Sequence, residues 1–233
     1  MQRLPRLNAK PMPFDLVIFD CDGTLVDTER VGNQVIVESL EAMGHAITLD
    51  EALAAFAGRK MADTLGLIEE RLGFPLPQAF LEQLREDMAI AFQARLEAMP
   101  GVPEVLRLLK AAKIPRCVAS NGPHEKMEVS LGVTGLLPYF GDAIFSAYDC
   151  KSWKPDPGLF LFAAQKLGHP PSACAVVEDS AFGVQGGIAA GMTVFGYAPR
   201  HDGKDLERLG ARVFHDMAEL PQLLKVPSCC ESQ

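Results

Sequence analysis

The chain contains 233 residues, of which 48% are apolar and 22% are charged, a composition typical of a globular protein with a sizeable core. Acidic residues outnumber basic ones by 30 to 22, and the formal net charge of −8 argues against general binding to nucleic acids. Residues 1–14 are basic but lack an apolar signal core, and the chain has no apolar run of about 18 residues. We therefore expect neither a secretory signal nor a membrane span.

The first predicted element is a strand, Phe14–Phe19, because this apolar run stops abruptly at Asp20. The stretch from 30 to 98 differs from the rest of the chain, because all its apolar residues follow a helical period. Glycine and proline residues divide this stretch into segments. The helices expected there are Val31–Met43, Leu49–Phe56, Met61–Leu72 and Pro77–Ala98.

After residue 100, predicted strands alternate with predicted helices, which indicates a parallel sheet with right-handed crossovers. The expected strands are Arg116–Ala119, Ala143–Phe145, Ala173–Val177, Met192–Phe195 and Arg212–Phe214. The expected helices are Val102–Ala112, Pro157–Leu167 and Ala181–Ala190.

A helical block that interrupts an α/β pattern after its first strand indicates an inserted cap. We expect an α/β fold with a Rossmann-like parallel-sheet core formed by residues 1–29 and 99–233, and a small all-helical cap formed by residues 30–98. The segments Thr28–Arg30 and Met99–Val102 are expected to act as hinges that let the cap close over a site. The alternative is that the helices of residues 30–98 pack on the sheet as part of one domain.

Six cysteines are spread along the chain without a CxxC pair, and three of them lie in or beside apolar, strand-like runs. This pattern favours buried, reduced thiols and a cytoplasmic location. The adjacent pair Cys229-Cys230 lies in a polar tail, and we interpret it as incidental.

Polar clusters follow three of the predicted strands: Asp20-Cys21-Asp22-Gly23-Thr24, Ser120-Asn121-Gly122 and Glu178-Asp179-Ser180. The carboxyl ends of parallel strands share one edge of a sheet, and ligands bind in the crevice outside that edge. Four carboxylates gathered there would repel one another unless a cation offset their charge, and Mg²⁺ prefers such oxygen ligands. With the metal bound, one carboxylate can act as a nucleophile and another as an acid and base.

The motifs that hold these residues resemble those of the haloacid dehalogenase-like hydrolase superfamily. FDCDGTLVDTE at 19–29 is similar to its first motif, and Ser120-Asn121 to its second. Lys154-Pro155-Asp156-Pro157 is similar to the third motif, and Glu178-Asp179-Ser180 with Gly183 to the fourth. The order and spacing also match, and the resemblance covers residues 13 to 225.

Within the superfamily, the helical block resembles the small cap of the phosphoglycolate phosphatase and β-phosphoglucomutase-like branch. The segments CVASNGPHEKM and FSAYDCKSWKPDP most resemble sugar phosphatases of the 6-phosphogluconate phosphatase type. This resemblance implies a Mg²⁺-dependent phosphatase that hydrolyses a small phosphorylated metabolite. No nucleic acid, membrane or obligate protein partner is expected.

The resemblance also implies a role for each site residue. Asp20 would attack phosphorus and form an aspartyl-phosphate, and Asp22 would first protonate the leaving oxygen and then activate water. Lys154 would bridge Asp20 and the phosphate. The implied phosphate-binding residues are Thr24, Ser120, Asn121 and Lys154. The implied metal-binding residues are Asp20, Asp22 through its backbone carbonyl, Asp179, and Glu178 directly or through water.

Three features of the sequence bear on the reaction class. Dehalogenases of this superfamily lack the aspartate at the position of Asp22, so its presence favours phosphoryl transfer. No lysine lies between Asp22 and Lys60, which argues against the phosphonatases. Gly32 stands where β-phosphoglucomutases carry a histidine, so hydrolysis is expected. A phosphosugar mutase and a catalytically silent binding or regulatory module remain the alternatives.

The Gly58-Arg59-Lys60 turn resembles the family's substrate loop, which makes Arg59 and Lys60 the expected specificity residues. These cations could meet the carboxylate or hydroxyls of an acidic sugar phosphate such as 6-phosphogluconate. The alternative is a solvated pair at a helix start.

Three further residues lie near the expected site. His124 and Lys126 could face the crevice, although an exposed position at a helix start is the favoured interpretation of His124. Trp153 is expected to pack beside the Lys154 turn.

Overall fold

A computed structural model describes residues 13–56, 59 and 61–227, which contain a six-stranded, fully parallel sheet. The strands are β1 (Leu16–Phe19), β2 (Arg116–Ser120), β3 (Ile144–Ser146), β4 (Cys174–Glu178), β5 (Thr193–Tyr197) and β6 (Arg212–Phe214). Their order across the sheet is β3-β2-β1-β4-β5-β6, which confirms the predicted α/β fold with a Rossmann-like parallel sheet. The strand order reverses at β1, and such a switch point is where ligands bind in open α/β sheets.

The register of the central strands brings three loops to one level. Phe19 lies beside Val118 of β2 and beside Val177 of β4. The residue after Phe19, Asp20, continues this pairing, because its backbone N–H donates to the Val177 carbonyl at 3.0 Å. The polar segments that follow β1, β2 and β4 therefore leave the sheet side by side.

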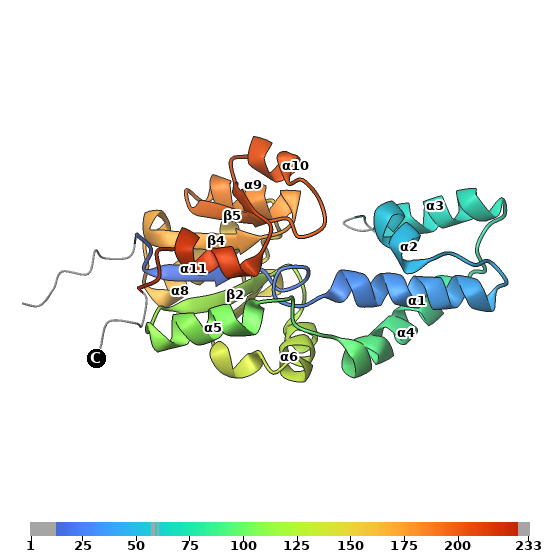
Figure 1. Ribbon diagram of the computed structural model, residues 1–233, viewed down its shortest axis with the longest axis horizontal. Helices are drawn as coiled ribbons and strands as arrows, with labels where there is room; N and C mark the ends of the chain where they lie inside the picture. Colours follow the sequence, from blue (N-terminus) through green and yellow to red (C-terminus); the bar gives the residue numbers. More distant parts are fainter. Residues whose placement is uncertain (1–12, 57–58, 60, 228–233) are drawn as a thin grey trace, which may run out of the picture.

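Helices cover both faces of the sheet (Figure 1). They are α5 (Val102–Ala111), α6 (His124–Val133), α7 (Ala147–Cys150), α8 (Gly158–Leu167), α9 (Ala181–Ala189), α10 (Lys204–Arg208) and α11 (Leu220–Leu223). Short 3₁₀ turns lie at η1 (Leu137–Tyr139), η2 (Pro171–Ala173) and η3 (Met217–Glu219). No helix among the described residues combines the length and apolar character that crossing a membrane requires.

The remaining helices are α1 (Thr28–Ala42), α2 (Leu49–Phe56), α3 (Met61–Leu72) and α4 (Phe80–Arg95). Figure 1 shows them as a separate group beyond the carboxyl ends of the strands, with α1 packed between α2 and α4. The two chain crossings that lead to this group pair with each other, because Asp27 N–H donates to the Glu97 carbonyl at 3.0 Å and Met99 N–H to the Leu25 carbonyl at 2.9 Å. Both crossings are therefore held as one short antiparallel ladder.

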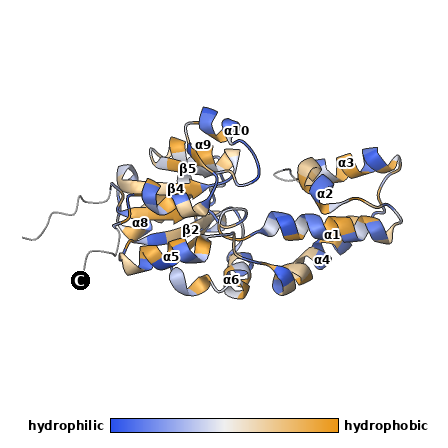
Figure 2. Cartoon of the chain, viewed as in Figure 1, coloured by the Kyte–Doolittle hydropathy of each residue, from blue (hydrophilic) through white to orange (hydrophobic). Residues whose placement is uncertain are grey.

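The core has two parts because successive strand residues face opposite sides of the sheet. Val17 and Phe19 lie on one side, and Leu16 and Ile18 lie on the other. Both faces are covered, which explains why the strands are continuous apolar runs. Figure 2 shows apolar residues on the strands and on α8, and polar residues on α10.

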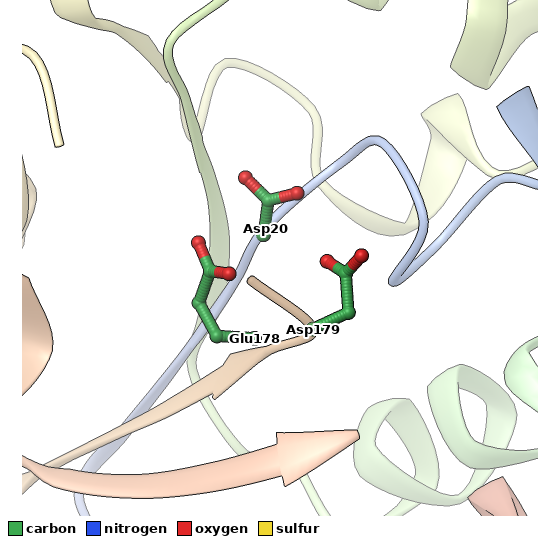
Figure 3. A group of neighbouring side chains, drawn as sticks. All are labelled: Asp20, Glu178 and Asp179. Carbon is green, nitrogen blue, oxygen red and sulfur yellow. The ribbon is translucent and has the colours of Figure 1, made fainter. Parts of the chain in front are cut away.

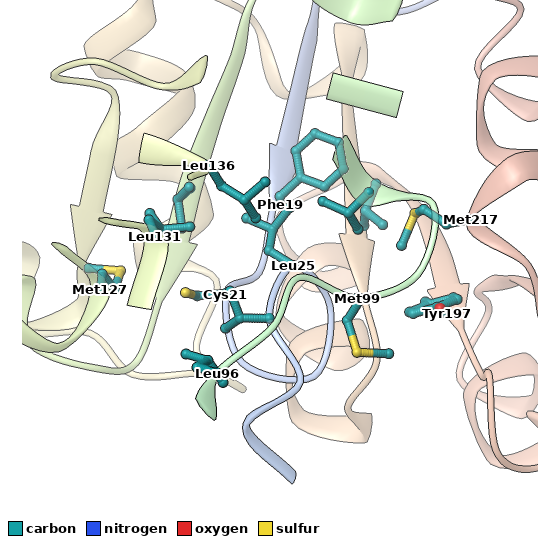
Figure 4. Close-up of a cluster of buried hydrophobic side chains, with 14 of the residues drawn as sticks. Phe19, Cys21, Leu25, Leu96, Met99, Met127, Leu131, Leu136, Tyr197 and Met217 are labelled. Atoms are coloured by element: carbon teal, nitrogen blue, oxygen red, sulfur yellow. The ribbon is translucent and has the colours of Figure 1, made fainter. Parts of the chain in front are cut away.

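One of the two clusters continues toward the crossings. Figure 4 shows Leu25 next to Phe19 at the end of β1, and Met99 and Leu96 of the same cluster beyond Leu25. The same cluster reaches buried residues of α1 to α4. Apolar packing therefore supports the crossings from both sides.

Several elements have other bounds than the sequence pattern predicted. Helix α1 begins at Thr28 and not at Val31, because the Asp27 side chain caps it by accepting from Arg30 N–H at 3.2 Å. The helix expected over Pro77–Ala98 is shorter at both ends, spanning Phe80–Arg95.

The four cysteines among the described residues are free thiols, and three of them, Cys21, Cys117 and Cys174, are buried, as expected. Burial raises the pKa of the Cys174 thiol to about 11 and that of the Cys21 thiol well above its usual value, which makes both poor nucleophiles. Cys229 and Cys230 lie outside the described residues.

Candidate active site

Three carboxylates meet at the carboxyl edge of the sheet, where the sequence places its strand-end clusters. One oxygen from each of Asp20, Glu178 and Asp179 lies within 4.8 Å of the others. Figure 3 shows the three carboxyl groups side by side at the ends of β1 and β4. The ends of these parallel strands therefore lie together as expected, and the clusters after β1 and at the end of β4 bring their carboxylates close enough to share one cation.

Lys154 joins two of these carboxylates. Its ammonium group donates to Asp20 Oδ1 and, at 2.5 Å, to Glu178 Oε1, and its side chain is only 4% exposed. Asn121 fixes the backbone of this lysine, because Asn121 Oδ1 accepts from Lys154 N–H at 2.9 Å. Asn121, in the polar cluster after β2, therefore positions the lysine that contacts Asp20 and Glu178 of the other two clusters.

The loop after β1 wraps closely around Asp179. Gly23 has a φ of 82°, and a Cβ at this position would overlap the Asp179 carboxyl group. The buried Thr24 donates its hydroxyl hydrogen to Asp179 Oδ1 at 2.8 Å. The Asp-x-Asp-Gly-Thr pattern thus supplies both the close approach and one hydrogen bond that positions Asp179.

Glu178 is the last residue of β4, and the start of α9 fixes its second oxygen. Glu178 Oε2 accepts from both the backbone N–H and the hydroxyl of Ser180 at 3.0 Å. Ser180 also caps α9 by accepting from Gly183 N–H at 3.0 Å. A Cβ at Gly183 would overlap the Glu178 carboxyl group, so this glycine leaves the space that the glutamate fills.

The balance of charge in the cluster is negative. Burial raises the pKa of Asp20 to about 7, with Glu178 adding to the effect and Lys154 opposing it. Burial also raises the pKa of Asp179 well above its usual value, and the Glu178 charge acts in the same direction. For Lys154, burial works to lower the pKa, but the Asp20 and Glu178 charges outweigh burial and raise it.

A divalent cation fits this donor set. Oδ1 of Asp20 is taken by Lys154 and Oδ1 of Asp179 by Thr24, which leaves the second oxygen of each carboxylate for a ligand. Hard oxygen donors in this number are typical of Mg²⁺ and Ca²⁺ sites. A bound dication would also stabilise the charged form of these carboxyl groups, whose pKa values are raised mainly by burial.

The Asp22 side chain lies outside the three-carboxylate group and is 31% exposed. Its Oδ2 accepts from Lys126 Nζ at 2.7 Å. Its predicted metal contact runs through the backbone carbonyl and stays a prediction. The ion pair with Lys126 joins residues 104 positions apart, and no pattern in the sequence predicts it beyond the presence of a lysine near the expected crevice.

The predicted phosphate-binding groups lie at the same edge, and their contacts to phosphate stay predictions. Ser120 is buried, and its Oγ accepts from Gly122 N–H at 3.1 Å, which leaves the hydroxyl hydrogen free to donate. The Thr24 hydroxyl is directed to Asp179 in this structure. Asn121 uses its side chain on the Lys154 backbone, as described above.

Of the two predicted specificity residues, Arg59 lies among the described residues and Lys60 does not. Arg59 is exposed, and its Nε donates to the Ala55 carbonyl at 2.7 Å near the end of α2. Gly58 and Lys60 lie outside the described residues. Both the substrate contact of Arg59 and Lys60 and the alternative of a solvated pair at a helix start stay predictions.

His124 is the first residue of α6, has a side chain 40% exposed, and lies 2.9 Å from the Asp149 carboxylate, so it contacts a neighbour at a helix start as expected. Trp153 is 43% exposed and packs edge-on against Tyr148 beside Lys154.

Arg200 is a site neighbour that the sequence analysis missed. It lies after β5, and its guanidinium contacts Asp27 Oδ2 at 2.5 Å and lies 3.8 Å from Glu29 Oε2. Arg200 therefore ties the sheet to the N-terminus of α1. Its partner Asp27 is 173 positions away, and no local pattern marks the pair.

Comparisons with known proteins agree with this geometry. The family described as haloacid dehalogenase-like hydrolase matches residues 14–191. The 6-phosphogluconate phosphatase of Escherichia coli (strain K12) is 36% identical over 212 residues, covering 91% of this chain and 95% of that protein.

A second relative, the phosphorylated carbohydrates phosphatase of Thermotoga maritima, is 28% identical over 214 residues, covering 91% of this chain and 98% of that protein. Among solved structures, a HAD family hydrolase from Deinococcus radiodurans R1 with bound phosphate and sodium has a TM-score of 0.83 and 35% identity, covering 93% of this chain and 97% of that one.

Proposed function

The chain belongs to the haloacid dehalogenase-like hydrolase family and is a phosphatase, and from this premise we propose that it is a Mg²⁺-dependent sugar phosphatase acting through an aspartyl-phosphate. The observation that carries the proposal is the position of Lys154 between Asp20 and Glu178, with Asp179 beside them. A buried carboxylate, a fixed cation and a divalent metal site at one sheet edge are the parts that phosphoryl transfer requires.

Asp20 is the proposed nucleophile. One of its carboxylate oxygens forms a bond to phosphorus while the ester P–O bond breaks, so the phosphoryl group moves to Asp20. Both reactants are negative, and the transition state spreads charge onto the phosphoryl oxygens. Lys154 offsets part of this charge, because its ammonium group is already fixed at Asp20 and needs no rearrangement during attack.

Asp22 is the proposed acid and base. Its protonated carboxyl group gives a proton to the leaving oxygen, which departs as an alcohol. The resulting carboxylate then accepts a proton from water while the water oxygen attacks phosphorus and the bond to Asp20 breaks. Inorganic phosphate leaves, and both aspartates return to their starting forms.

Asp20, Asp179 and the Asp22 backbone carbonyl are the proposed Mg²⁺ ligands, with Glu178 contributing directly or through water. When bound, the metal neutralises phosphate charge and orients the ester for in-line attack. The contacts of Thr24 and Gly23 with Asp179 keep this carboxylate at the cluster.

The proposed substrate is a sugar phosphate, with 6-phosphogluconate as the leading compound because the E. coli relative carries that name. Residues 30–98 are the proposed cap domain, which would supply Arg59 and Lys60 to the substrate's carboxylate or hydroxyls. We propose hydrolysis and not mutase chemistry, because Gly32 in the first part of α1 stands at the position where β-phosphoglucomutases carry a histidine.

A panel of phosphorylated metabolites, each compared by phosphate release and kcat/KM with Mg²⁺ and with EDTA, tests the proposal. We expect the highest kcat/KM on an acidic sugar phosphate, dependence on Mg²⁺, and no turnover in a folded Asp20→Asn variant. Stable transfer of the phosphoryl group between sugar positions without phosphate release would establish the mutase alternative. Unchanged turnover in Asp20→Asn would remove this residue from the nucleophile role.

A further inference from the structure

Lys126 is a cation beside the site to which the proposed reaction assigns no task. It is the third residue of α6, and its Nζ donates to Asp22 Oδ2 at 2.7 Å. Its neighbour His124 contacts Asp149 instead, so within the described residues Lys126 is the cation of this helix start that reaches the loop after β1.

The backbone from which the lysine extends is held firmly. The Ser146 hydroxyl donates to the Gly122 carbonyl at 2.6 Å and thereby ties the turn before α6 to β3. A Cβ at Gly122 would lie 3.7 Å from Lys126 Cδ, which shows that the lysine side chain passes over this glycine. Nζ therefore reaches Asp22 because the backbone at the start of α6 is held in place and the lysine side chain extends directly over Gly122.

The two oxygens of Asp22 differ in their surroundings. Oδ2 is paired with Lys126, whereas Oδ1 is buried and has no hydrogen-bond partner among the described residues. A buried acceptor without a partner is costly and needs an explanation. An oxygen that must exchange a proton with the substrate and with water gains its partner only when they bind.

We propose that Lys126 is a positioning residue for Asp22, holding Oδ2 so that Oδ1 carries the proton to and from the reacting oxygen. This inference rests on the proposed function. In the first step Oδ1–H gives its proton to the leaving oxygen as the ester bond breaks, and the carboxylate that results is stabilised by the ammonium group of Lys126. The same ion pair keeps the carboxylate in place to take a proton from water.

The basicity of the leaving group provides the test. An alkyl alcohol needs a proton to leave, whereas p-nitrophenolate leaves without one, so only alkyl esters depend on Asp22 in this step. The ratio kcat/KM reports the steps up to alcohol release and excludes hydrolysis of the aspartyl-phosphate. We expect Lys126→Met to lower kcat/KM on uncharged-alcohol phosphates such as glycerol phosphate by about 10- to 100-fold, and on p-nitrophenyl phosphate by about 2-fold or less.

Two further variants make this expectation specific. Lys126→Arg should recover most of the alkyl activity, because it restores a cation at Oδ2. In an Asp22→Asn background, Lys126→Met should have no additional effect on any ester, since the group that it positions is gone. Lys166→Met, in the last turn of α8, removes the same charge elsewhere and should leave kcat/KM unchanged on all esters.

Other outcomes would overturn the inference. Equal losses on alkyl and aryl esters would assign Lys126 to phosphate binding or to folding. A loss that appears only with substrates carrying a second negative group would assign Lys126 to substrate recognition. Unchanged kcat/KM in Lys126→Met, with an active wild type, would remove Lys126 from the reaction and leave the proposed function intact, whereas a wild type that releases no phosphate from any ester would contradict the proposed function itself.

Discussion

Lys154 offsets part of the negative charge of the site, because its ammonium group contacts two of the three clustered carboxylates. A buried charge is stabilising only while its partners remain, and removing one member of such a group leaves the others uncompensated. Lys154→Met keeps an unbranched side chain of similar length and deletes the ammonium group, together with the contact of Nζ with the Phe160 ring at 5.1 Å.

Without metal, we expect Lys154→Met to lower the free energy of unfolding by about 3 kcal/mol in urea titrations and to reduce phosphatase activity to background. Lys151→Met is the matched control, because Lys151 is exposed on the same segment. If both variants unfold at the same urea concentration, the ammonium group at Asp20 and Glu178 contributes no net stability.

Asp179 gives a prediction that separates metal binding from catalysis. A ligand that binds only the folded state stabilises it by about 2.7 kcal/mol at 100 times its Kd. We expect Mg²⁺ to raise the melting temperature of the wild type in a concentration-dependent manner, EDTA to reverse the rise, and Asp179→Asn to abolish it. Asparagine can still accept the Thr24 hydrogen bond, so the variant should fold. A melting temperature of the wild type that does not respond to Mg²⁺ would contradict a metal site at this cluster.

The sequence predicted four carboxylates at this edge, of which three meet and the Asp22 side chain lies outside the group, and it did not predict all their neighbours. The approach of Asp20 to Glu178 and Asp179 follows from a general rule, because the ends of parallel strands share an edge. The pairs Lys126–Asp22 and Arg200–Asp27 follow from no such rule. They depend on how α6 and the segment after β5 are oriented in three dimensions, which periodicity does not encode.

Among the secondary-structure elements, regular apolar periodicity predicted which segments form helices. It did not predict the first or last residue of every element. The bounds of α2 and α3 agree with the pattern of their apolar residues. Helix α1 begins earlier than its apolar pattern, because the hydrogen bond from Arg30 N–H to Asp27 sets its start. Strand β4 continues one residue beyond its apolar run to include Glu178, which is stabilised there by Lys154 and Ser180.

The start of α9 illustrates how the residue at a helix position can depend on a buried side chain from a neighbouring strand. Glycine inside a helix is less favourable than alanine by about 0.5–1 kcal/mol, so a Gly→Ala change in a helix ordinarily stabilises. At Gly183 the added Cβ would overlap the Glu178 carboxyl group. We expect Gly183→Ala to destabilise the protein by about 1–3 kcal/mol and to lower activity, because Glu178 must move away from Lys154.

Gly66→Ala in α3 is the matched control, because among the described residues no atom other than the nearby backbone of its own helix lies within 4 Å of the Cβ added there. This variant should gain stability by up to about 1 kcal/mol. Urea unfolding and kcat/KM, measured on both variants, check the pair. A Gly183→Ala protein as stable and active as the control would show that the Glu178 position is not tightly constrained by α9.

The whole molecule consists of a sheet layer with its helices and a helical group joined to it by two paired crossings. Because Asp27–Glu97 and Leu25–Met99 hydrogen bonds link the crossings, they can bend only together. Arg200 adds an ion pair between the sheet and the start of α1 at the same level. This arrangement favours a single hinge over independent motion of the two segments.

The proposed phosphoryl transfer to Asp20 would require that bulk water be excluded while the alcohol leaves. In this structure the side chains of Asp22 and Lys126 are 31% and 40% exposed, so the edge of the site is accessible to solvent. We therefore expect the helical group to close over the site when Asp20 carries a phosphoryl group. Beryllofluoride with Mg²⁺ mimics that state, and small-angle X-ray scattering should then give a smaller radius of gyration than metal alone. Asp20→Asn, which cannot bind the mimic covalently, should show no change, and identical scattering of the wild type with and without the mimic would mean that water is excluded without movement of the helical group.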